Sequence, residues 1–566
     1  MTKVMKYILQ VFVIMILPWT SCYGQSEDNS VTVNIDLGKE LGSFTNAWSW
    51  FGYDEPNYTY MDDGKKLLTE LAELSPTPVF IRTHNLLTTG DGTAAMKWGS
   101  TNVYTEDDQG NPVYDWTIMD RIFDTWIERG IKPIVEMGFM PEALSSKPQP
   151  YRHFWKPGDS YNDVYTGWRY PPNDYNKWAE LIYRWVIHSV ERYGQPEVES
   201  WYWELWNEPD IKYWGGTFEE YCKLYDYSAD AVKRALPTAR VGGPHVTSPG
   251  YSGPARFLKA FLVHCESGTN YATGQTGAPL DFIAFHAKGA PRFTNGIVQM
   301  GIGNQLKQVE KGFEIISSNP RFKDLPVVIG ECDPEGCAAC GMTVAPENGY
   351  RNGTMFSSYT ASAFTRIFEM ARHFNVNLLG IVSWAFEFED QPWFHGFRDL
   401  ATNGVDKPVL NVFRMFGKMG GTSVEVLTDG GFTWREMVDS GVRGTKSDIG
   451  AIATKRGNET AVLFWNYHDD DKMAPDAVVN FVIKGFTSKK AEVVQYRIDK
   501  SHSNSYEAWK QMGSPQNPSL EQYAELERAG QLQISGKPSK VKAKKGTVII
   551  NTTLQRQGVG LIIISN

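Results

Sequence analysis

Between about residues 40 and 400 the chain alternates short apolar runs with longer amphipathic stretches. The apolar runs are rich in β-branched and aromatic residues, and most are continuous rather than alternating. That pattern is typical of strands buried on both faces of a parallel sheet. It predicts eight strands, at residues 42–51, 78–84, 132–139, 200–208, 239–246, 280–289, 325–331 and 378–387.

The stretches between these strands have the periodicity of helices with one apolar face. Eight strand–helix units fit a (β/α)8 barrel with long loops. An open doubly wound sheet is the alternative, but no glycine-rich phosphate fingerprint follows the first strand. The predicted helices lie at 63–74, 116–130, 175–194, 217–236, 254–265, 304–316 and 359–374, with a last one at 409–421.

Beyond residue 421 the pattern changes to short runs of period two separated by turn residues. This predicts a β-sandwich-like accessory domain over 421–566, after a catalytic (β/α)8 barrel over 31–420. The segment 31–37, "VTVNIDL", is a further candidate strand of the accessory domain. Two domains also agree with the length of 566 residues, which is long for one core.

The N-terminus has the form of an export signal. Lys3 and Lys6 precede an apolar stretch, 7–17, that is too short to span a bilayer. We expect a signal peptide over 1–24, and two endings stay open. Cleavage after Gly24 would release a soluble periplasmic or secreted protein, whereas Cys22 in "WTSC" could carry a lipid and tether an outer-membrane lipoprotein.

Composition narrows the class of partner. The net charge of −9 argues against nucleic acid, which needs clustered basic residues. Aromatic residues make up 13% of the chain, with 19 Trp, which suits a large core and also stacking on small rings such as sugars. The cysteines Cys332, Cys337 and Cys340 cluster in "ECDPEGCAAC". We expect a disulfide within this cluster, ahead of free buried thiols and, last, a metal site.

Polar residues recur where the predicted strands end. In a barrel of this kind the chemistry lies at the carboxyl ends of the strands, so these side chains should face one pocket. Two glutamates at such positions suit glycoside hydrolysis, because one can protonate the leaving oxygen while the other attacks the anomeric carbon or activates water. The strand-end residues are Arg82, His84, Asn207, Glu208, His286, Lys288, Glu331, Asp333 and Trp384, followed by the acidic tract Glu387, Glu389 and Asp390.

The surroundings of the two glutamates differ. Glu208 follows Trp203 and Trp206, and an apolar wall raises the pKa of a carboxyl group, so Glu208 suits the acid. Glu331 suits the nucleophile, kept ionised by Arg82 and the imidazoles. Glu204 shares the strand face of Glu208 but lies deeper, where pairing with an arginine is expected. Asp210, Asp333 and Glu335 are expected mainly to hold loops.

Five motifs give the chain a resemblance to a known family. They are "WNEPD" (206–210), "GECDP" (330–334), "IRTHN" (81–85), "FHAKGA" (285–290) and the C-terminal "DKSHSNSYEAWKQMGSP" (499–515). Together they resemble glycoside hydrolase family 39, which contains β-xylosidases and α-L-iduronidases, over nearly all of the chain after the signal.

The resemblance implies a role for each motif residue. Glu208 would be the general acid/base and Glu331 the nucleophile, with retention of configuration and no cofactor or metal. Asn207 would bind the 2-hydroxyl of the sugar, and Trp384 would be the platform under its ring. The remaining sugar-binding candidates are Arg82, His84, His286, Lys288 and Asp390.

The substrate is an oligosaccharide or polysaccharide under every function we consider. The first is an exo-acting β-xylosidase working on plant or algal oligosaccharides. An iduronidase-like uronidase is the alternative that Lys288 favours, since a uronate gains a charge-assisted hydrogen bond from a cation. In that case Lys288→Ala should damage only the uronate activity. A glycan-binding protein without catalysis is the third, and the presence of both glutamates argues against it.

Overall fold

The computed structural model describes residues 30–565 and contains a closed barrel of eight parallel strands. All eight predicted strands are present, which confirms the (β/α)8 fold. The first begins at Trp50 rather than near residue 42, because residues 42 and 43 still belong to a long strand of the second domain. The barrel strands are β2 (Trp50–Tyr53), β3 (Phe80–Thr83), β6 (Lys132–Met137), β7 (Tyr202–Leu205), β8 (Arg240–Val246), β9 (Phe282–Lys288), β12 (Val327–Asp333) and β13 (Leu378–Trp384).

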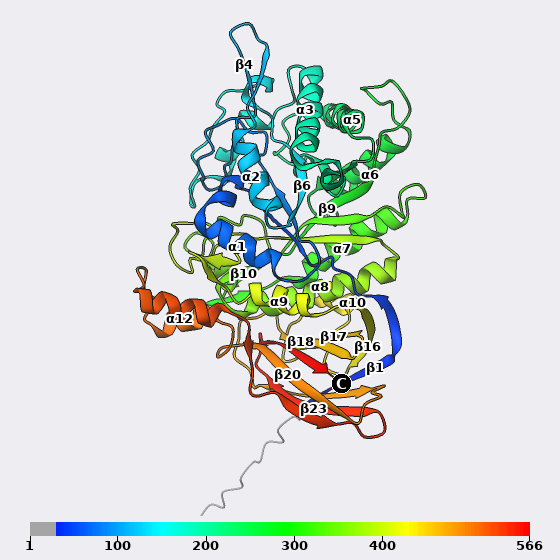
Figure 1. The fold of residues 1–566 in the computed structure, drawn as a ribbon, viewed down its shortest axis with the longest axis vertical. Helices are drawn as coiled ribbons and strands as arrows, with labels where there is room; N and C mark the ends of the chain where they lie inside the picture. Colours follow the sequence, from blue (N-terminus) through cyan, green and yellow to red (C-terminus); the bar gives the residue numbers. More distant parts are fainter. Residues whose placement is uncertain (1–29, 566) are drawn as a thin grey trace, which may run out of the picture.

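Helices surround the barrel, so the strands are buried from both sides (Figure 1). Local sequence fixes several helix starts. Thr217 and Glu220 form a reciprocal capping box at the start of one helix, and Asp174 accepts two backbone N–H groups at the start of another. The helices after the strands are α1 (Asp62–Ala72), α2 (Thr117–Ile127), α3 (Tyr175–Tyr193), α4 (Gln195–Val198), α5 (Phe218–Ala235), α6 (Ser252–Ser267), α7 (Ile302–Ser317), α8 (Thr354–Phe374) and α9 (Leu410–Lys418).

Short strands and 3-10 helices lie in the loops at the carboxyl ends of the barrel strands. They include three hairpins, β4 (Tyr104–Glu106) with β5 (Pro112–Tyr114), β10 (Arg292–Thr294) with β11 (Ile297–Gln299), and β14 (Ala401–Thr402) with β15 (Val405–Asp406). The 3-10 helices are η1 (Pro56–Tyr60), η2 (Glu142–Leu144), η3 (Tyr161–Val164), η4 (Gly167–Arg169) and η5 (Pro346–Asn352).

The second domain is one ten-stranded sheet that bends over its own core. Phe464 and Phe481, from strands far apart in the sheet order, meet with ring centroids 4.9 Å apart, which gives the predicted sandwich-like form. The strands are β1 (Ser30–Ser43), β16 (Thr422–Thr428), β17 (Asp448–Arg456), β18 (Glu459–Tyr467), β19 (Ala477–Lys484), β20 (Lys490–Ile498), β21 (Gln533–Ile534), β22 (Ser539–Lys542), β23 (Thr547–Leu554) and β24 (Val559–Ser565). The helices α10 (Trp434–Ser440), α11 (Ser505–Gln511) and α12 (Leu520–Gly530) complete this part of the chain.

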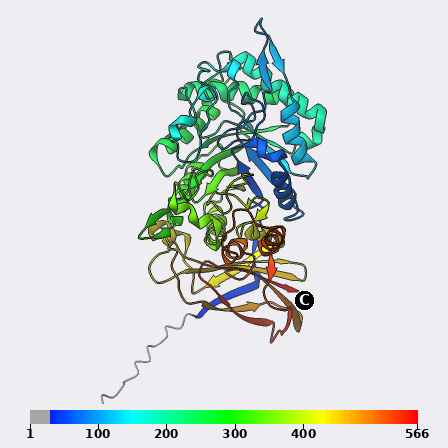
Figure 2. The same ribbon diagram turned by 90° about the vertical axis from the view of Figure 1, so that its left-hand side faces the viewer.

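The two domains exchange segments at their boundary. The candidate strand at 31–37 is present within β1, which pairs with β16 and β19 although it precedes the barrel in sequence. Conversely, α12 returns to the barrel domain, where Asn411 donates a hydrogen bond of 2.6 Å to the carbonyl oxygen of Gly530. Figures 1 and 2 show the barrel stacked on the sheet, with α8 and α9 at the junction.

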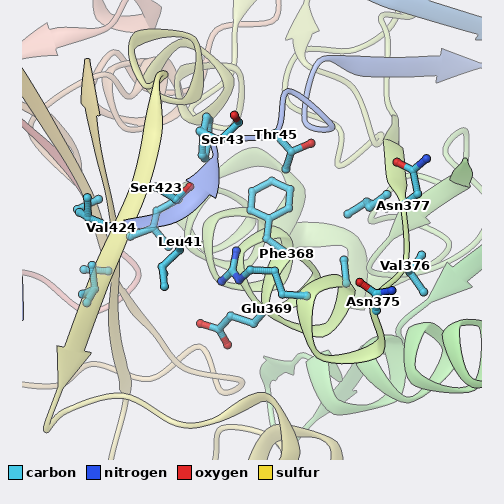
Figure 3. Close-up of a pocket in the computed structure, with 18 residues that line it drawn as sticks. Leu41, Ser43, Thr45, Phe368, Glu369, Asn375, Val376, Asn377, Ser423 and Val424 are labelled. Carbon is cyan, nitrogen blue, oxygen red and sulfur yellow. The ribbon is translucent and has the colours of Figure 1, made fainter. Parts of the chain in front are cut away.

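A cavity of about 330 Å³ lies at this junction, between the C-terminal part of α8 and strands β1, β16 and β17 (Figure 3). Phe368, Glu369 and Asn375 line its barrel side, and Leu41 and Ser423 line its sheet side. None of the strand-end candidates lines it, so the chemistry lies elsewhere. No helix within residues 30–565 is long and apolar enough to cross a membrane. The expected signal peptide and Cys22 lie outside the described residues.

Candidate active site

Arg82, at the end of β3, is the fully buried centre of the strand-end cluster. Its guanidinium contacts Glu204 through Nε, while Nη2 lies 2.9 Å from Glu136 and donates a hydrogen bond of 3.2 Å to Asn207. Nη1 lies 3.5 Å from Glu331. The prediction that Glu204 pairs with an arginine is therefore confirmed, and Arg82 links β6, β7 and β12 beneath the site.

Glu331, at the end of β12, lies among positive charges. Lys288 contacts one carboxylate oxygen, while the other lies 3.5 Å from Arg82 and 3.4 Å from His84. Burial opposes ionisation, but Lys288 and the neighbouring imidazoles hold the pKa of Glu331 well below its usual range. Burial also opposes the charged form of His84, yet Glu136 and Glu331 raise its pKa to about 9. Glu331 is thus an ionised carboxylate, as a nucleophile must be.

Glu208 follows β7 in a left-handed backbone conformation, with φ of 44°. Its carboxylate lies 3.0 Å from Nδ1 of His286, and its backbone N–H donates to the carbonyl oxygen of His245 at 3.1 Å. Burial, reinforced by the charge of Glu331, raises the pKa of Glu208 to about 7. Near neutral pH a large fraction of Glu208 therefore carries the proton that a general acid needs.

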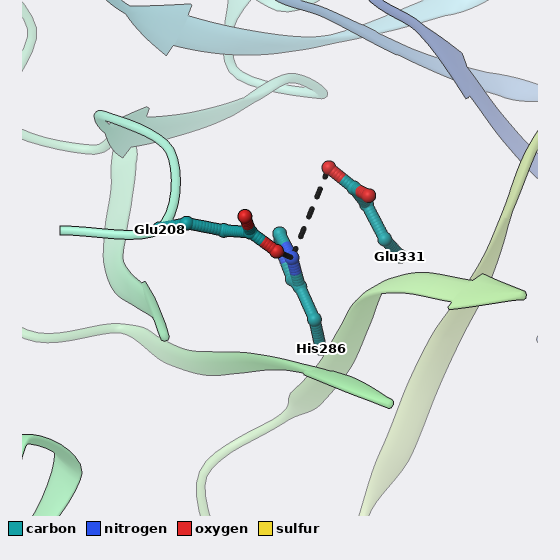
Figure 4. A group of neighbouring side chains, drawn as sticks. All are labelled: Glu208, His286 and Glu331. Atoms are coloured by element: carbon teal, nitrogen blue, oxygen red, sulfur yellow. Dashed lines mark hydrogen bonds and ion pairs between the residues drawn. The ribbon is translucent and has the colours of Figure 1, made fainter. Parts of the chain in front are cut away.

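The two glutamates face each other across His286 (Figure 4). One oxygen from each carboxylate and one nitrogen of His286 all lie within 4.8 Å of one another. Such a triad could hold a metal ion in geometry alone, but Glu331 already neighbours Lys288, Arg82 and His84, and their charges disfavour a further cation. Metal-free chemistry stays our prediction. The arrangement sets a carboxyl group with a raised pKa opposite one with a lowered pKa, with one oxygen of each within 4.8 Å of the other.

Lys288, which the sequence suggested as a ligand of a uronate, contacts two carboxylates of the protein. Its ammonium group contacts Glu331 and also lies 2.8 Å from Asp333, so its charge is shared between two carboxylates. That Lys288→Ala harms only the hydrolysis of uronates stays an untested prediction. Because Lys288 contacts Glu331, we expect that removing this cation also raises the pKa of Glu331, whatever the substrate.

The loop after β12 is held by buried ion pairs. Glu335 lies 2.5 Å from Arg351 and 2.7 Å from Arg398, so its predicted role in holding the loop is confirmed. Asp333 instead accepts a hydrogen bond from the backbone N–H of Trp384 and contacts Lys288. The disulfide expected in the cysteine cluster joins Cys337 and Cys340, and Cys332 stays a free buried thiol.

Trp384 is the last residue of β13 and is buried, whereas Asp390 lies in the loop after β13 and is exposed. The Trp384 ring is 2% exposed and packs against Arg82, 5.0 Å away, and the ring of His84, 4.4 Å away. Asp390 is exposed, and within residues 30–565 no hydrogen bond or ion pair joins it to the cluster. The platform role of Trp384 and the sugar-binding role of Asp390 stay predictions.

A buried ion pair at the end of β2 was not predicted from the sequence. Asp54 accepts a hydrogen bond of 2.9 Å from Nε1 of Trp384, lies 3.4 Å from His84, and forms a buried ion pair with Lys97. Burial and the charge of Asp54 raise the pKa of Glu55 to about 8. The signal was available, because Asp54 and Glu55 lie shortly after the first predicted strand, 42–51, and directly after β2. Lys97, in contrast, lies in a long loop without any distinguishing motif.

Comparisons with known proteins agree with this geometry. The family model of glycosyl hydrolases family 39 matches residues 31–545. A β-xylosidase from Caldicellulosiruptor saccharolyticus is 27% identical over 88% of this chain and 92% of its own length. An α-L-iduronidase from Mus musculus is 25% identical over 73% of this chain and 63% of its own length.

A solved structure shares the fold. The monomeric β-xylosidase from Caulobacter crescentus CB15 superposes with a TM-score of 0.71 and 21% identity, over 94% of this chain and 99% of that one. Because the family model covers almost the whole described chain, the protein belongs to family 39 of the glycosyl hydrolases and is a glycosidase acting on carbohydrate.

Proposed function

We propose that this glycosidase is a retaining, exo-acting β-xylosidase, with Glu208 as acid/base and Glu331 as nucleophile. The observation that carries the proposal is the opposite protonation of two carboxyl groups that face each other within 4.8 Å. Oxygens this close favour retention, because the carboxyl groups of retaining enzymes are about 5–5.5 Å apart and those of inverting enzymes about 6.5–9.5 Å apart.

The proposed reaction has two steps, in which Glu331 is first the nucleophile and then the leaving group, and Glu208 is first the acid and then the base. A carboxylate oxygen of Glu331 attacks the anomeric carbon while the glycosidic bond breaks, and the proton of Glu208 passes to the leaving oxygen. In the second step Glu208, now a carboxylate, takes a proton from water, which displaces Glu331 and releases the sugar with its original configuration. His286 positions Glu208 in both steps through the 3.0 Å contact.

The small exposed fraction of the two glutamate side chains favours attack on the end of a glycan chain. The side chain of Glu208 is 14% exposed and that of Glu331 is 8% exposed, so a polysaccharide chain has little room to lie across both. Lys288 favours a neutral sugar over a uronate, because Glu331 and Asp333 already share its charge. The β-xylosidase relative matched over 88% of this chain supports xylose as the released sugar.

We further propose plant or algal oligosaccharides as the source of that sugar, and export through the N-terminal signal. Mass spectrometry of the mature N-terminus would decide between cleavage after Gly24 and lipidation of Cys22. Either outcome supports export, whereas an intact N-terminus in the purified native protein would refute it.

The direct test compares aryl β-xyloside with aryl α-L-iduronide. We expect xylose release from the first, with β-xylose as the first-formed anomer by ¹H NMR. Glu331→Ala should abolish the release and leave substrate binding measurable by calorimetry. Hydrolysis of the iduronide alone would support the uronidase alternative. Binding without hydrolysis by the wild type would support the glycan-binding alternative.

A further inference from the structure

The loops beside Glu208 form the side of the site from which the leaving group departs. In a glycosidase the general acid stands next to the leaving oxygen, so side chains beyond Glu208 face the leaving sugar rather than the one held by Glu331. Tyr213 lies in the turn that follows Glu208, and its hydroxyl is 2.8 Å from that of Tyr161. Tyr165 packs against Tyr213 with ring centroids 5.7 Å apart.

Tyr161 begins the 3-10 helix η3 and Tyr165 directly follows it, and both residues are partly exposed. Burial raises the pKa of both hydroxyl groups, and the negative charge of nearby Glu208 adds to the effect. A partly exposed aromatic ring close to the acid is a suitable surface for the apolar face of a sugar. These two tyrosines therefore supply a stacking surface on the leaving-group side.

Two cations flank the same surface. The guanidinium carbon of Arg169 and the ammonium nitrogen of Lys212 each lie 5.8 Å from the centre of the Tyr165 ring. They come from different loops, since Arg169 ends η4 and Lys212 follows β7. Within the described part of the chain neither forms an ion pair with a carboxylate, and their hydrogen bonds go to the carbonyl oxygen of Trp214 and the amide oxygen of Asn162.

The guanidinium of Arg169 is held by one hydrogen bond and has further N–H groups free to donate. Its Nη2 donates to Trp214 at 3.2 Å, while its Nη1 makes no hydrogen bond within residues 30–565 and is not fully buried. A guanidinium held in this way is suited to a carboxylate or sulfate, which it can bind through two parallel hydrogen bonds. The unpaired cations are notable in a protein whose net charge is −9.

We propose that Tyr161, Tyr165, Arg169 and Lys212 form a subsite for a leaving-group sugar that carries an anionic group, either a carboxylate or a sulfate ester. The proposal rests on the assignment of Glu208 as acid and of xylose as the released sugar. The enzyme then takes a neutral sugar at the Glu331 side and an acidic sugar on the other, so it trims neutral ends from an acidic glycan.

The test compares three disaccharides in which xylose is β-linked to the same hydroxyl of a neutral hexose, of the corresponding hexuronate, and of the hexose 6-sulfate. We expect kcat/KM to be higher for one or both acidic forms, by roughly three- to tenfold at low ionic strength. This preference should shrink in 0.5 M NaCl, because salt screens exposed charges. The better acidic substrate identifies the anionic group.

Lys212→Gln is the decisive variant, since Lys212 is exposed and its replacement should not impair folding. We expect the ratio of acidic to neutral kcat/KM to fall about threefold. Arg169→Lys, which keeps the charge but loses the paired hydrogen bonds, should lower the ratio less. Lys484→Gln, which removes an exposed charge from the distant sheet strand β19, is the matched control and should keep the wild-type ratio.

Three outcomes would overturn the subsite. Equal kcat/KM for all three disaccharides in the wild type is the first. A ratio that Lys212→Gln and Lys484→Gln lower equally is the second, because it would reflect the overall charge of the protein. Failure to release xylose from any of the three, or from aryl β-xyloside, would instead refute the proposed function and the subsite with it.

Discussion

Replacing Lys288 by methionine should move the entire pH profile of β-xyloside hydrolysis to higher pH. Lys288 contacts Glu331 and lowers its pKa, and it also lowers the pKa of Glu208, though less than burial and Glu331 raise it. Hydrolysis needs Glu331 ionised and Glu208 protonated. Raising the first pKa shifts the acidic limb of kcat/KM upward, and raising the second shifts the basic limb upward from about pH 7.

The size of the shift follows from the contacts that remain. A pair of unit charges about 3 Å apart is worth about 5 kcal/mol at an effective dielectric constant of about 20. Arg82 and His84 stay at 3.5 and 3.4 Å from Glu331 and retain part of its stabilisation. We therefore expect the acidic limb to rise by roughly one to two pH units, where each unit is about 1.4 kcal/mol. Activity should therefore fall most at the acidic end of the profile and be kept or gained at the basic end.

The assay is the initial rate with aryl β-xyloside at low substrate concentration between pH 4 and 9. Lys288→Arg keeps the positive charge and is the matched control, so its two limbs should stay near those of the wild type. Limbs that do not move in Lys288→Met, together with a loss confined to aryl α-L-iduronide, would refute this reasoning. That result would restore the role that the sequence alone suggests for Lys288.

Three further predictions concern neighbouring groups. Glu208→Ala should lower kcat/KM by roughly 10²- to 10⁴-fold for xylobiose but much less for a xyloside with an activated aryl leaving group, and azide should accelerate the second step by replacing water; equal losses on both substrates would count against Glu208 as the acid. Arg82→Met should lower the free energy of unfolding by roughly 3–5 kcal/mol, because Glu136, Glu204 and Glu331 lose their buried cation, and Glu204→Gln in the same chain should restore part of it in denaturant titrations. Asp54→Asn should lower the melting temperature and kcat/KM together, since it leaves Lys97 buried without its carboxylate; a stable, fully active variant would show that the pair is not needed.

The eight strands and the meeting of Glu208 with Glu331 could be predicted because their signals are local. Each strand is an unbroken apolar run, and each glutamate stands where such a run ends, so the (β/α)8 fold alone brings Glu208 and Glu331 to one pocket. A disulfide within the cluster of Cys332, Cys337 and Cys340 was also expected, and the structure places it between Cys337 and Cys340. These features need no knowledge of loop conformation.

The features that were missed depend on where long loops return. Lys97 reaches Asp54 from a position 43 residues away, and nothing in its own surroundings marks it. The strand at 31–37 was expected in the accessory domain, but its partners β16 and β19 were not, because the whole barrel separates them from β1 in sequence. The partners of Lys288 were hidden for the same reason, because a strand-end lysine can point at substrate or at a neighbouring strand with the same sequence. Side-chain pairing across strands therefore had to come from the structure.

The segment from Glu204 to Glu208 shows most directly how environment assigns roles to identical residues. The two glutamates lie four positions apart, both in buried surroundings, and burial raises the pKa of each. For Glu204 the opposing charge of Arg82, with His245, outweighs burial and lowers the pKa to about 2. For Glu208 the nearest strong charge is the like charge of Glu331, which adds to burial and raises the pKa to about 7. Arg82 thus contacts Glu204 directly and lowers the pKa of Glu208 less than burial and Glu331 raise it, so a shift of the cation toward Glu208 would weaken the proposed general acid without changing Glu208 itself.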